Sequence, residues 1–148
     1  MTLLLYDISQ GMARNYSPMV IGRTIEAVWH SALVVYGIEF YFGGGICEGV
    51  PMKTPYGMPL REMHFGETEI PIELFREYLF DLKFQFNTNT YHILNNNCNH
   101  FTNEIAFFLC GKNLPDNILN QHKELNNTPM GRYILPMLEK MNPNPNPG

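Results

Sequence analysis

Residues 31–42 read Ser-Ala-Leu-Val-Val-Tyr-Gly-Ile-Glu-Phe-Tyr-Phe, and this stretch gives the clearest indication of the fold. Its first half is apolar and β-branched, and its second half alternates with the two-residue period of a strand. Tyr36 and Gly37 lie between the halves, which is the spacing of a tight hairpin turn. The stretch therefore predicts two antiparallel strands, ended by the three glycines at 43–45.

Three other short segments are predicted to form strands. Residues 3–8 and 91–94 contain apolar runs, and residues 61–65 directly follow a segment rich in glycine and proline. The predicted strands are residues 3–8, 61–65 and 91–94. Residues 47–59 are rich in glycine and proline, so they are predicted to form a loop.

Apolar residues recur at helical spacing in two longer segments. One follows Pro71, which suits the start of a helix because its missing N–H has no partner there, and it runs to about Leu82. The other is Cys98–Cys110, with Asn97 placed to cap its start and Gly111 just past its end.

One more short helix is expected after Thr128, and Pro136 is expected to interrupt it. Antiparallel strands in one part of the chain and helices in another predict the α+β class.

Composition indicates a single globular domain. The chain has 148 residues, 45% of them apolar and 16% charged, with a net charge of −4. A chain of this size can bury a core without disulfides or metals. Residues 1–138 are therefore predicted to form one domain, and the Asn/Pro-rich residues 139–148 a disordered tail. No cluster of basic residues is present, which argues against nucleic acid as a partner.

Targeting signals and cysteine usage favour a reduced, soluble protein. The first residues lack the basic start of a signal peptide, and no run approaches the ~18 apolar residues of a membrane span. Three cysteines form no CxxC pair, so free thiols are expected rather than disulfides or a metal site. Residues 61–81 carry a net charge of −4, which indicates either a solvated helix face or a docking surface for a basic partner.

Cys98 and His30 are the candidate reactive pair. Cys98 lies in the first turn of a predicted helix, where free N–H groups and the helix dipole favour a thiolate. His30 lies at the start of an apolar strand that could hold an imidazole as its base. The alternative is an inert buried thiol and a merely hydrogen-bonded histidine. Cys47 and Cys110 lack a helix start, and His100 points to another side of the helix than Cys98.

Several longer motifs add a family resemblance. They read Leu-Tyr-Asp-Ile-Ser-Gln-Gly-Met-Ala-Arg at 5–14, Glu-Ala-Val-Trp-His-Ser at 26–31, Phe-Tyr-Phe-Gly-Gly at 40–44 and Asn-Cys-Asn-His-Phe-Thr-Asn-Glu at 97–104. Together they resemble the PPPDE family and, within it, the deSUMOylating isopeptidases of the DeSI type. The likeness extends to 111–115 and 128–131, so it covers the chain to about residue 138.

The resemblance implies a small papain-like cysteine peptidase in circularly permuted order. Its fold would be an antiparallel, partly rolled sheet packed with helices. Its catalytic dyad would map onto His30 and Cys98, with no metal or other cofactor. The resemblance also implies a homodimer, and the corresponding location is cytoplasmic and nuclear.

The implied reaction is the removal of a ubiquitin-like modifier, most simply SUMO, from a target lysine. Cys98 would attack the C-terminal glycine carbonyl, and His30 would protonate the leaving amine and then help water to hydrolyse the thioester. The Cys98 N–H, with Asn97, would hold the oxyanion. Trp29 would shield the dyad or line the channel for the Gly-Gly tail, unless it is simply packed in the core.

Two other functions stay open from the sequence. The same dyad could cleave acyl groups from protein cysteines, which would need an apolar tunnel beside Cys98. A non-enzymatic domain could bind ubiquitin-like proteins or shuttling factors through its acidic helix. Whether the modifier is SUMO or ubiquitin does not follow from the residues, since both end in Gly-Gly.

Overall fold

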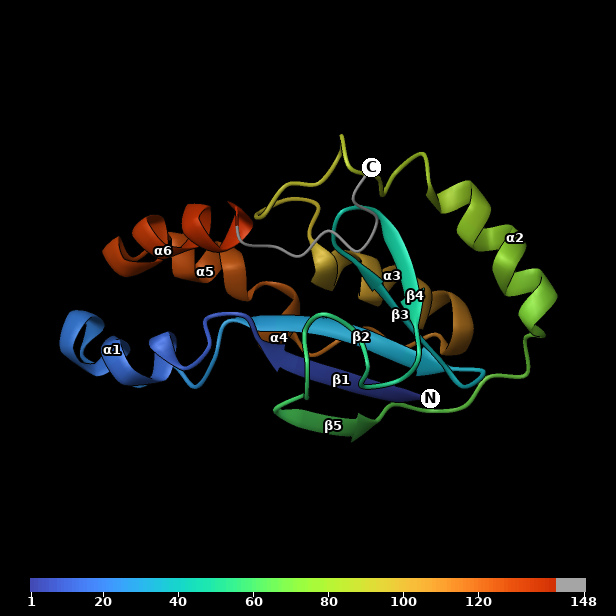
Figure 1. The fold of residues 1–148 in the computed structure, drawn as a ribbon, viewed down its shortest axis with the longest axis horizontal. Coiled ribbons are helices and arrows are strands. Elements are labelled where there is room, and N and C mark those ends of the chain that lie inside the picture. The colour runs from blue at the N-terminus through green and yellow to red at the C-terminus, as the bar shows by residue number, and fades with distance from the viewer. Residues whose placement is uncertain (141–148) are drawn as a thin grey trace.

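The computed structural model describes residues 1–140 and, within them, one five-stranded antiparallel sheet with six helices (Figure 1). The strands lie in the order β4-β3-β2-β1-β5, so the sheet is open, with β4 and β5 at its edges. Their bounds are β1 Thr2–Asp7, β2 Trp29–Val35, β3 Ile38–Phe42, β4 Ile46–Gly49 and β5 Arg61–His64. The α+β class and the antiparallel sheet are confirmed, and the relation to papain stays a prediction.

The hairpin of β2 and β3 forms as its sequence predicts. Val35 pairs with Ile38, and the two residues between them have positive φ angles, 56° at Tyr36 and 73° at Gly37. Two left-handed residues give the turn whose twist matches that of the flanking strands. The hairpin therefore supplies the centre of the sheet.

The other strand predictions have mixed outcomes. The first predicted strand and the one at 61–65 are confirmed as β1 and β5, which pair with each other. The prediction of a loop from residue 47 was wrong for residues 47–49, because these residues belong to β4, which pairs with β3. The strand predicted at 91–94 was also wrong, since only an isolated bridge between His92 and Asn96 forms.

Two of the helices match the sequence closely. The helix expected after Pro71 is α2, and that expected at 98–110 is α3, capped as predicted by Asn97 and ended by Gly111 with a φ of 73°. Two very short helices, α4 and α5, were missed. The bounds are α1 Met12–Ile21, α2 Ile72–Leu82, α3 Cys98–Cys110, α4 Asp116–Leu119, α5 Gln121–Asn126 and α6 Pro129–Lys140.

The interruption expected at Pro136 was wrong, because α6 continues through it. Pro136 faces solvent, so water can bond the carbonyl that loses its N–H partner. Residues 139 and 140 still belong to α6. The rest of the predicted tail, 141–148, lies outside the described residues.

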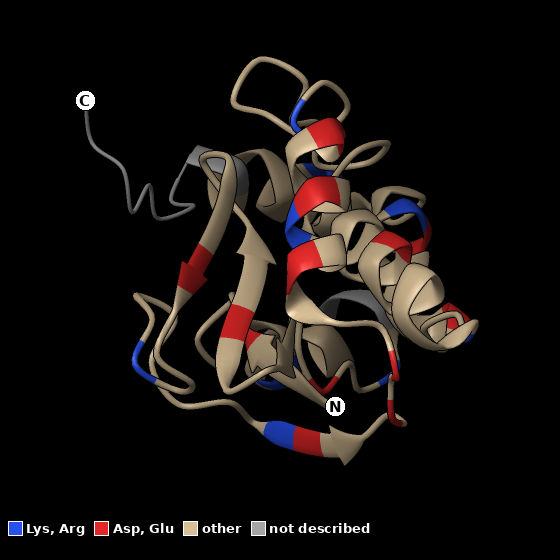
Figure 2. Ribbon diagram, turned by 90° about the vertical axis from the view of Figure 1, so that its right-hand side faces the viewer, with Lys and Arg blue, Asp and Glu red and all other residues tan. Residues whose placement is uncertain are grey.

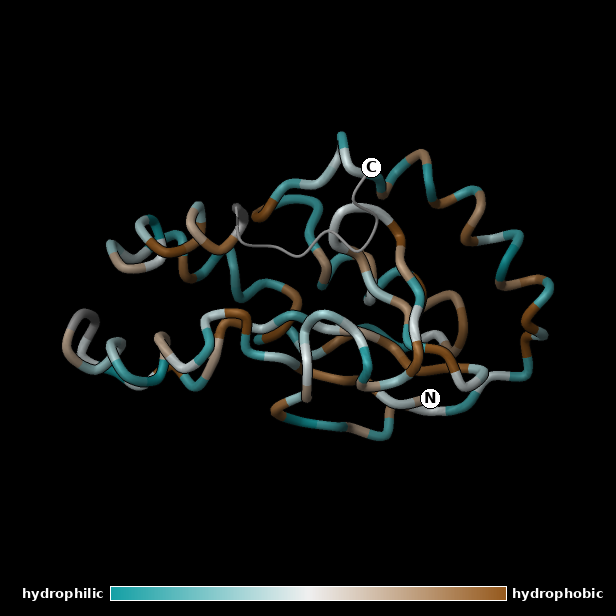
Figure 3. Tube along the Cα trace, viewed as in Figure 1, coloured by the Kyte–Doolittle hydropathy of each residue, from teal (hydrophilic) through white to brown (hydrophobic). Residues whose placement is uncertain are grey.

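Apolar side chains pack on both faces of the sheet. Figure 3 shows hydrophobic stretches of the trace in the strands and hydrophobic positions that alternate with hydrophilic ones along α2. The larger cluster lies between one face and the helices α2 and α3, and it includes Phe40, Phe75 and Phe101. A smaller cluster on the other face, around Tyr6 and Tyr41, is covered by the loop that follows β4. At one end of the sheet, α1 and α6 lie side by side (Figure 1).

Acidic residues follow one another along α2 (Figure 2), and Glu73, Glu77 and Asp81 are all exposed. The opposite face of this helix is core, as its apolar spacing predicts. Arg76, also on α2, forms an ion pair with Glu48 of β4 at 2.8 Å. In the part of the chain that the structure describes, no helix is both long and apolar enough to cross a membrane.

Candidate active site

His30 and Cys98 line the same cavity, which has a volume of about 120 Å³. His30 is the second residue of β2, and Cys98 is the first residue of α3. Tyrosine rings and aliphatic side chains form much of the remaining wall, which comprises Tyr6, Asp7, Ile8, Gln10, Pro55, Tyr56, Tyr91, Ile93 and Leu138. The structure thus brings together the two residues that the sequence singled out.

Buried hydrogen bonds join the strand to the helix on either side of this pair. Asn99 Nδ2 donates to the Trp29 carbonyl at 3.1 Å, and Ser31 Oγ donates to Asn99 Oδ1 at 2.7 Å. The Thr102 hydroxyl lies 3.1 Å from the Ser31 carbonyl and 3.0 Å from that of Cys98. The residues that flank His30 are therefore tied to the first turns of α3.

Burial decides the state of the Cys98 thiol. The residue is 3% exposed, and burial raises the pKa of the thiol to about 12. Backbone N–H groups of Ser31, Asn99 and Cys98 itself act in the opposite direction. The helix start thus has the stabilising effect expected from the sequence, but desolvation outweighs it.

His30 is neutral for the same reason. Burial, with a smaller contribution from the charge of His122, lowers the pKa of His30 to about 3. Its Nε2 atom is buried and has no hydrogen-bond partner in the structure. At neutral pH the cavity therefore holds a thiol and a neutral imidazole, the latter with an unused nitrogen.

Tyr56 covers His30, a role that the sequence analysis missed. Its ring stacks on the imidazole with 3.6 Å between the ring centroids and 13° between the planes. The loop that carries it is held by Glu39, which accepts from the Met52 N–H at 2.9 Å and from the Tyr6 hydroxyl at 2.7 Å. Local sequence gives no signal for this contact, because Tyr56 lies in a loop rich in proline and glycine.

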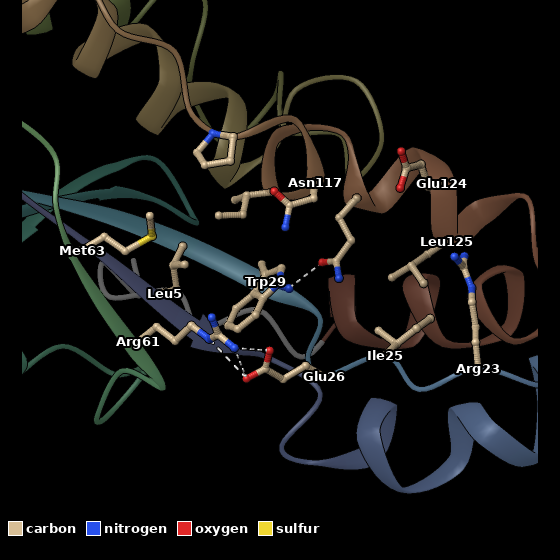
Figure 4. A pocket seen from close by; sticks show the side chains of 13 residues that line it. Leu5, Arg23, Ile25, Glu26, Trp29, Arg61, Met63, Asn117, Glu124 and Leu125 are labelled. Carbon is tan, nitrogen blue, oxygen red and sulfur yellow. Dashed lines mark hydrogen bonds and ion pairs between the residues drawn. The ribbon is translucent and has the colours of Figure 1, made fainter.

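Trp29 lies on the other face of β2 from His30. It does not line the cavity of the pair but a second pocket of about 380 Å³. Figure 4 shows Trp29 there beside the ion pair of Arg61 and Glu26, whose closest atoms are 2.6 Å apart. Alternate residues of a strand point to opposite faces, so this position does not support the expected role as a shield or channel wall.

Asn97 is occupied as a helix cap. Its Oδ1 accepts from the N–H groups of Asn99 and His100 at 2.9 and 3.3 Å, and its Nδ2 donates to the Ile93 carbonyl at 2.8 Å. Both ends of the side chain are therefore committed within the fold. This arrangement favours the structural role over a direct contact with an oxyanion.

The remaining candidates lie outside the cavity. Cys110 is at the far end of α3, and burial raises the pKa of Cys47 to about 11. His100 Nδ1 accepts from the Asn97 N–H as part of the helix cap. Within residues 1–140, no three His, Cys, Asp or Glu side chains are grouped so that they could hold a metal ion.

A thiol at a helix N-terminus and a histidine in one cavity are the arrangement of cysteine hydrolases. Residues 1–139 match the family model described as "PPPDE putative peptidase domain". The chain belongs to the PPPDE peptidase family.

Comparison with individual proteins agrees with this assignment. The chain is 39% identical over 141 residues to the Desumoylating isopeptidase 1 of Xenopus laevis, covering 94% of this chain and 83% of that protein. The human Desumoylating isopeptidase 1 is also 39% identical over 141 residues, with coverage of 94% and 84%. A DeSI-like protein of Arabidopsis thaliana is 31% identical over 94 residues, covering 60% of this chain and 42% of that protein.

Proposed function

We propose that this chain is a cysteine isopeptidase that removes SUMO from target lysines. The observation that carries the proposal is the shared cavity of His30 and Cys98. Family membership and the desumoylating relatives support both the reaction and the modifier. The homodimer and the cytoplasmic and nuclear location stay predictions.

The reaction begins with a neutral pair. As Cys98 Sγ attacks the carbonyl carbon of the terminal glycine of SUMO, its proton passes to His30. When the tetrahedral intermediate collapses, the C–N bond breaks and His30 delivers this proton to the leaving lysine amine. Water, deprotonated by His30, then attacks the thioester and releases the SUMO carboxylate and the Cys98 thiol.

Backbone groups supply the oxyanion site in this proposal. The N–H groups of Cys98 and Ser31 lie close enough to the thiol to lower its pKa, whereas that of Asn99 donates to the Asn97 side chain. They are fixed by a helix start and a strand, so they need little reorganisation when charge develops. Asn97 contributes indirectly, by capping the helix.

The size of the cavity favours a glycine tail over an acyl chain. About 120 Å³ is room for about four water molecules. Two glycines carry no side chain and fit a narrow space, whereas a long acyl chain needs an apolar tunnel. S-acyl cleavage is therefore the second candidate function, and the experiment below distinguishes it from isopeptide cleavage.

The decisive experiment is intact-mass measurement after mixing the chain with SUMO or ubiquitin that carries a C-terminal electrophile. We expect a SUMO adduct that Cys98→Ala abolishes and that His30→Ala forms far more slowly. An adduct that forms equally well with Cys98→Ala would refute the assignment of Cys98 as the nucleophile. An adduct with ubiquitin but not with SUMO would show that the modifier is ubiquitin. Hydrolysis of an acyl-cysteine peptide, with no adduct to either modifier, would show that the reaction is S-acyl cleavage instead.

A further inference from the structure

His122, at the second position of α5, is a buried histidine to which the proposed mechanism gives no part. Its Nε2 atom lies 3.1 Å from the carbonyl oxygen of Trp29. Its Nδ1 atom lies 3.2 Å from Nδ2 of Asn97. Trp29 directly precedes His30, and Asn97 directly precedes Cys98. One imidazole therefore contacts the residue before each member of the proposed pair.

The ring of His122 has three polar neighbours. Nε2 faces the Trp29 carbonyl, and Nδ1 faces both Nδ2 of Asn97 and, at 3.0 Å, the carbonyl oxygen of Ile93. A proton on Nε2 suits the contacts with Trp29 and Asn97, whereas a proton on Nδ1 suits the contact with Ile93. Burial lowers the pKa of His122, against the opposing effect of the Ile93 and Trp29 carbonyls, and so favours the neutral ring.

The bonded groups would keep a partner without His122. The Trp29 carbonyl also accepts from Asn99 Nδ2 at 3.1 Å. Asn97 Nδ2 also donates to the Ile93 carbonyl at 2.8 Å. Removing the ring therefore leaves both groups with a hydrogen bond. The large loss of folding free energy that a buried polar group without a partner would cause does not arise. What is lost is the bridge between Trp29 and Asn97, while the bonds of Asn99 to Trp29 and Ser31 still join the strand to the helix.

We propose that His122 is a positioning residue, which sets the separation of His30 and Cys98 by bridging the backbone segments that carry them. The inference rests on the proposed function of this pair. His122 touches neither the thiol nor the imidazole in any contact of the structure. Its positioning effect passes through Trp29 and Asn97, each fixed to the next residue by the chain itself, and is separate from its small electrostatic effect on the pKa of His30.

The test compares His122→Leu with Gln121→Leu. Gln121 is the neighbour of His122 on α5 and binds the same strand: its Oε1 accepts from the Trp29 N–H at 2.8 Å, and its Nε2 donates to the Ala27 carbonyl at 2.7 Å. These bonds do not reach Asn97. Gln121→Leu thus controls for the loss of buried hydrogen bonds to β2, and His122→Gln keeps a donor for Trp29.

Turnover of a SUMO conjugate is the first readout. A misplacement of about 1 Å costs ~10²-fold in rate, so His122→Leu should lower kcat by about that factor while KM changes little. His122→Gln should recover part of the loss. Gln121→Leu should lower the melting temperature and leave kcat near the wild-type value. Equal kcat in His122→Leu and wild type overturns the inference, as does an equal loss in both leucine variants.

Ring ¹⁵N NMR is the second readout and needs no substrate. We expect the His122 ring to be mostly neutral at pH 6.5 and above, and the ring signals of His30 to move in His122→Leu but not in Gln121→Leu. Unmoved His30 signals overturn the inference. An inactive wild type, or an active Cys98→Ala, refutes the proposed function instead, and the His30 signals then decide the positioning role alone.

Discussion

At the scale of single residues, desolvation sets the chemistry of the cavity. Burial raises the pKa of Cys98 and lowers that of His30, so both shifts favour uncharged side chains. In the proposed reaction the proton therefore moves from Cys98 to His30 only as the thiol attacks the substrate. Tyr56, stacked on His30, covers one face of the imidazole.

The free enzyme should therefore react slowly with small thiol reagents at neutral pH. Because the pKa of Cys98 is raised to about 12, the rate of alkylation should keep rising with pH well past the ordinary value of 9. Alkylation of the Cys98 peptide, followed by mass spectrometry across a pH series, measures this. The partly exposed Cys110 provides an internal reference. A plateau at or below pH 9 would contradict the stated effect of burial.

Replacement of Tyr56 by alanine should expose the pair to water. Hydration lowers the pKa of the thiol, and each unit of that fall increases the thiolate fraction about tenfold at neutral pH. Alkylation of Cys98 in Tyr56→Ala should thus be faster than in the wild type. Tyr133→Ala, which removes a ring that is 75% exposed, is the matched control. Unchanged alkylation in Tyr56→Ala would show that this ring does not cover the thiol.

At the scale of elements, local pattern predicted the parts of the chain whose structure is local. The turn at Tyr36 and Gly37 and the cap at Asn97 both use bonds between near neighbours, so their sequence signals were sufficient. Strand β4 instead depends on pairing with β3, and α5 is too short for a periodic signal. Both elements depend on contacts with residues distant in the sequence, which a pattern of neighbouring residues does not reveal.

The approach of α5 to α6 gives a prediction at this scale. A methyl group added at Gly131 would overlap the carbonyl of Leu125, a backbone atom that cannot turn aside. Gly131→Ala should therefore destabilise the protein by about 1–3 kcal/mol, although alanine ordinarily favours a helix by up to ~1 kcal/mol. Urea unfolding measures the difference. Gly49→Ala, where the added atom meets only Thr54 at 3.4 Å, is the control. A Gly131→Ala variant as stable as wild type would contradict the close approach.

At the scale of the whole molecule, the site is assembled from distant segments. Strand β2 supplies His30, α3 supplies Cys98, the loop after β4 supplies Tyr56, and α5 supplies His122. The sheet and α3 bury these groups together, so their ionisation is coupled to folding.

Stability should accordingly fall in mild acid. His30 has a folded pKa lowered to about 3 from an ordinary value of 6.5, so the unfolded chain binds its proton first as pH falls. The stabilising effect is complete above about pH 6.5 and is lost on the way toward pH 3, with a slope of up to ~1.4 kcal/mol per pH unit. Urea unfolding between these values measures it, and His30→Ala should show a shallower dependence. The same slope in both proteins would assign the acid sensitivity to other groups.

The sequence by itself determined the hairpin, the capped helix that begins at Cys98 and the motifs of the family. Only the tertiary structure decided that the thiol and the imidazole are neutral, that Tyr56 covers them and that His122 bridges their backbones. Caps, turns and periodicity are set by residues a few positions apart. Desolvation and bridging depend on every atom within a few ångströms, and here those atoms come from segments far apart in the chain.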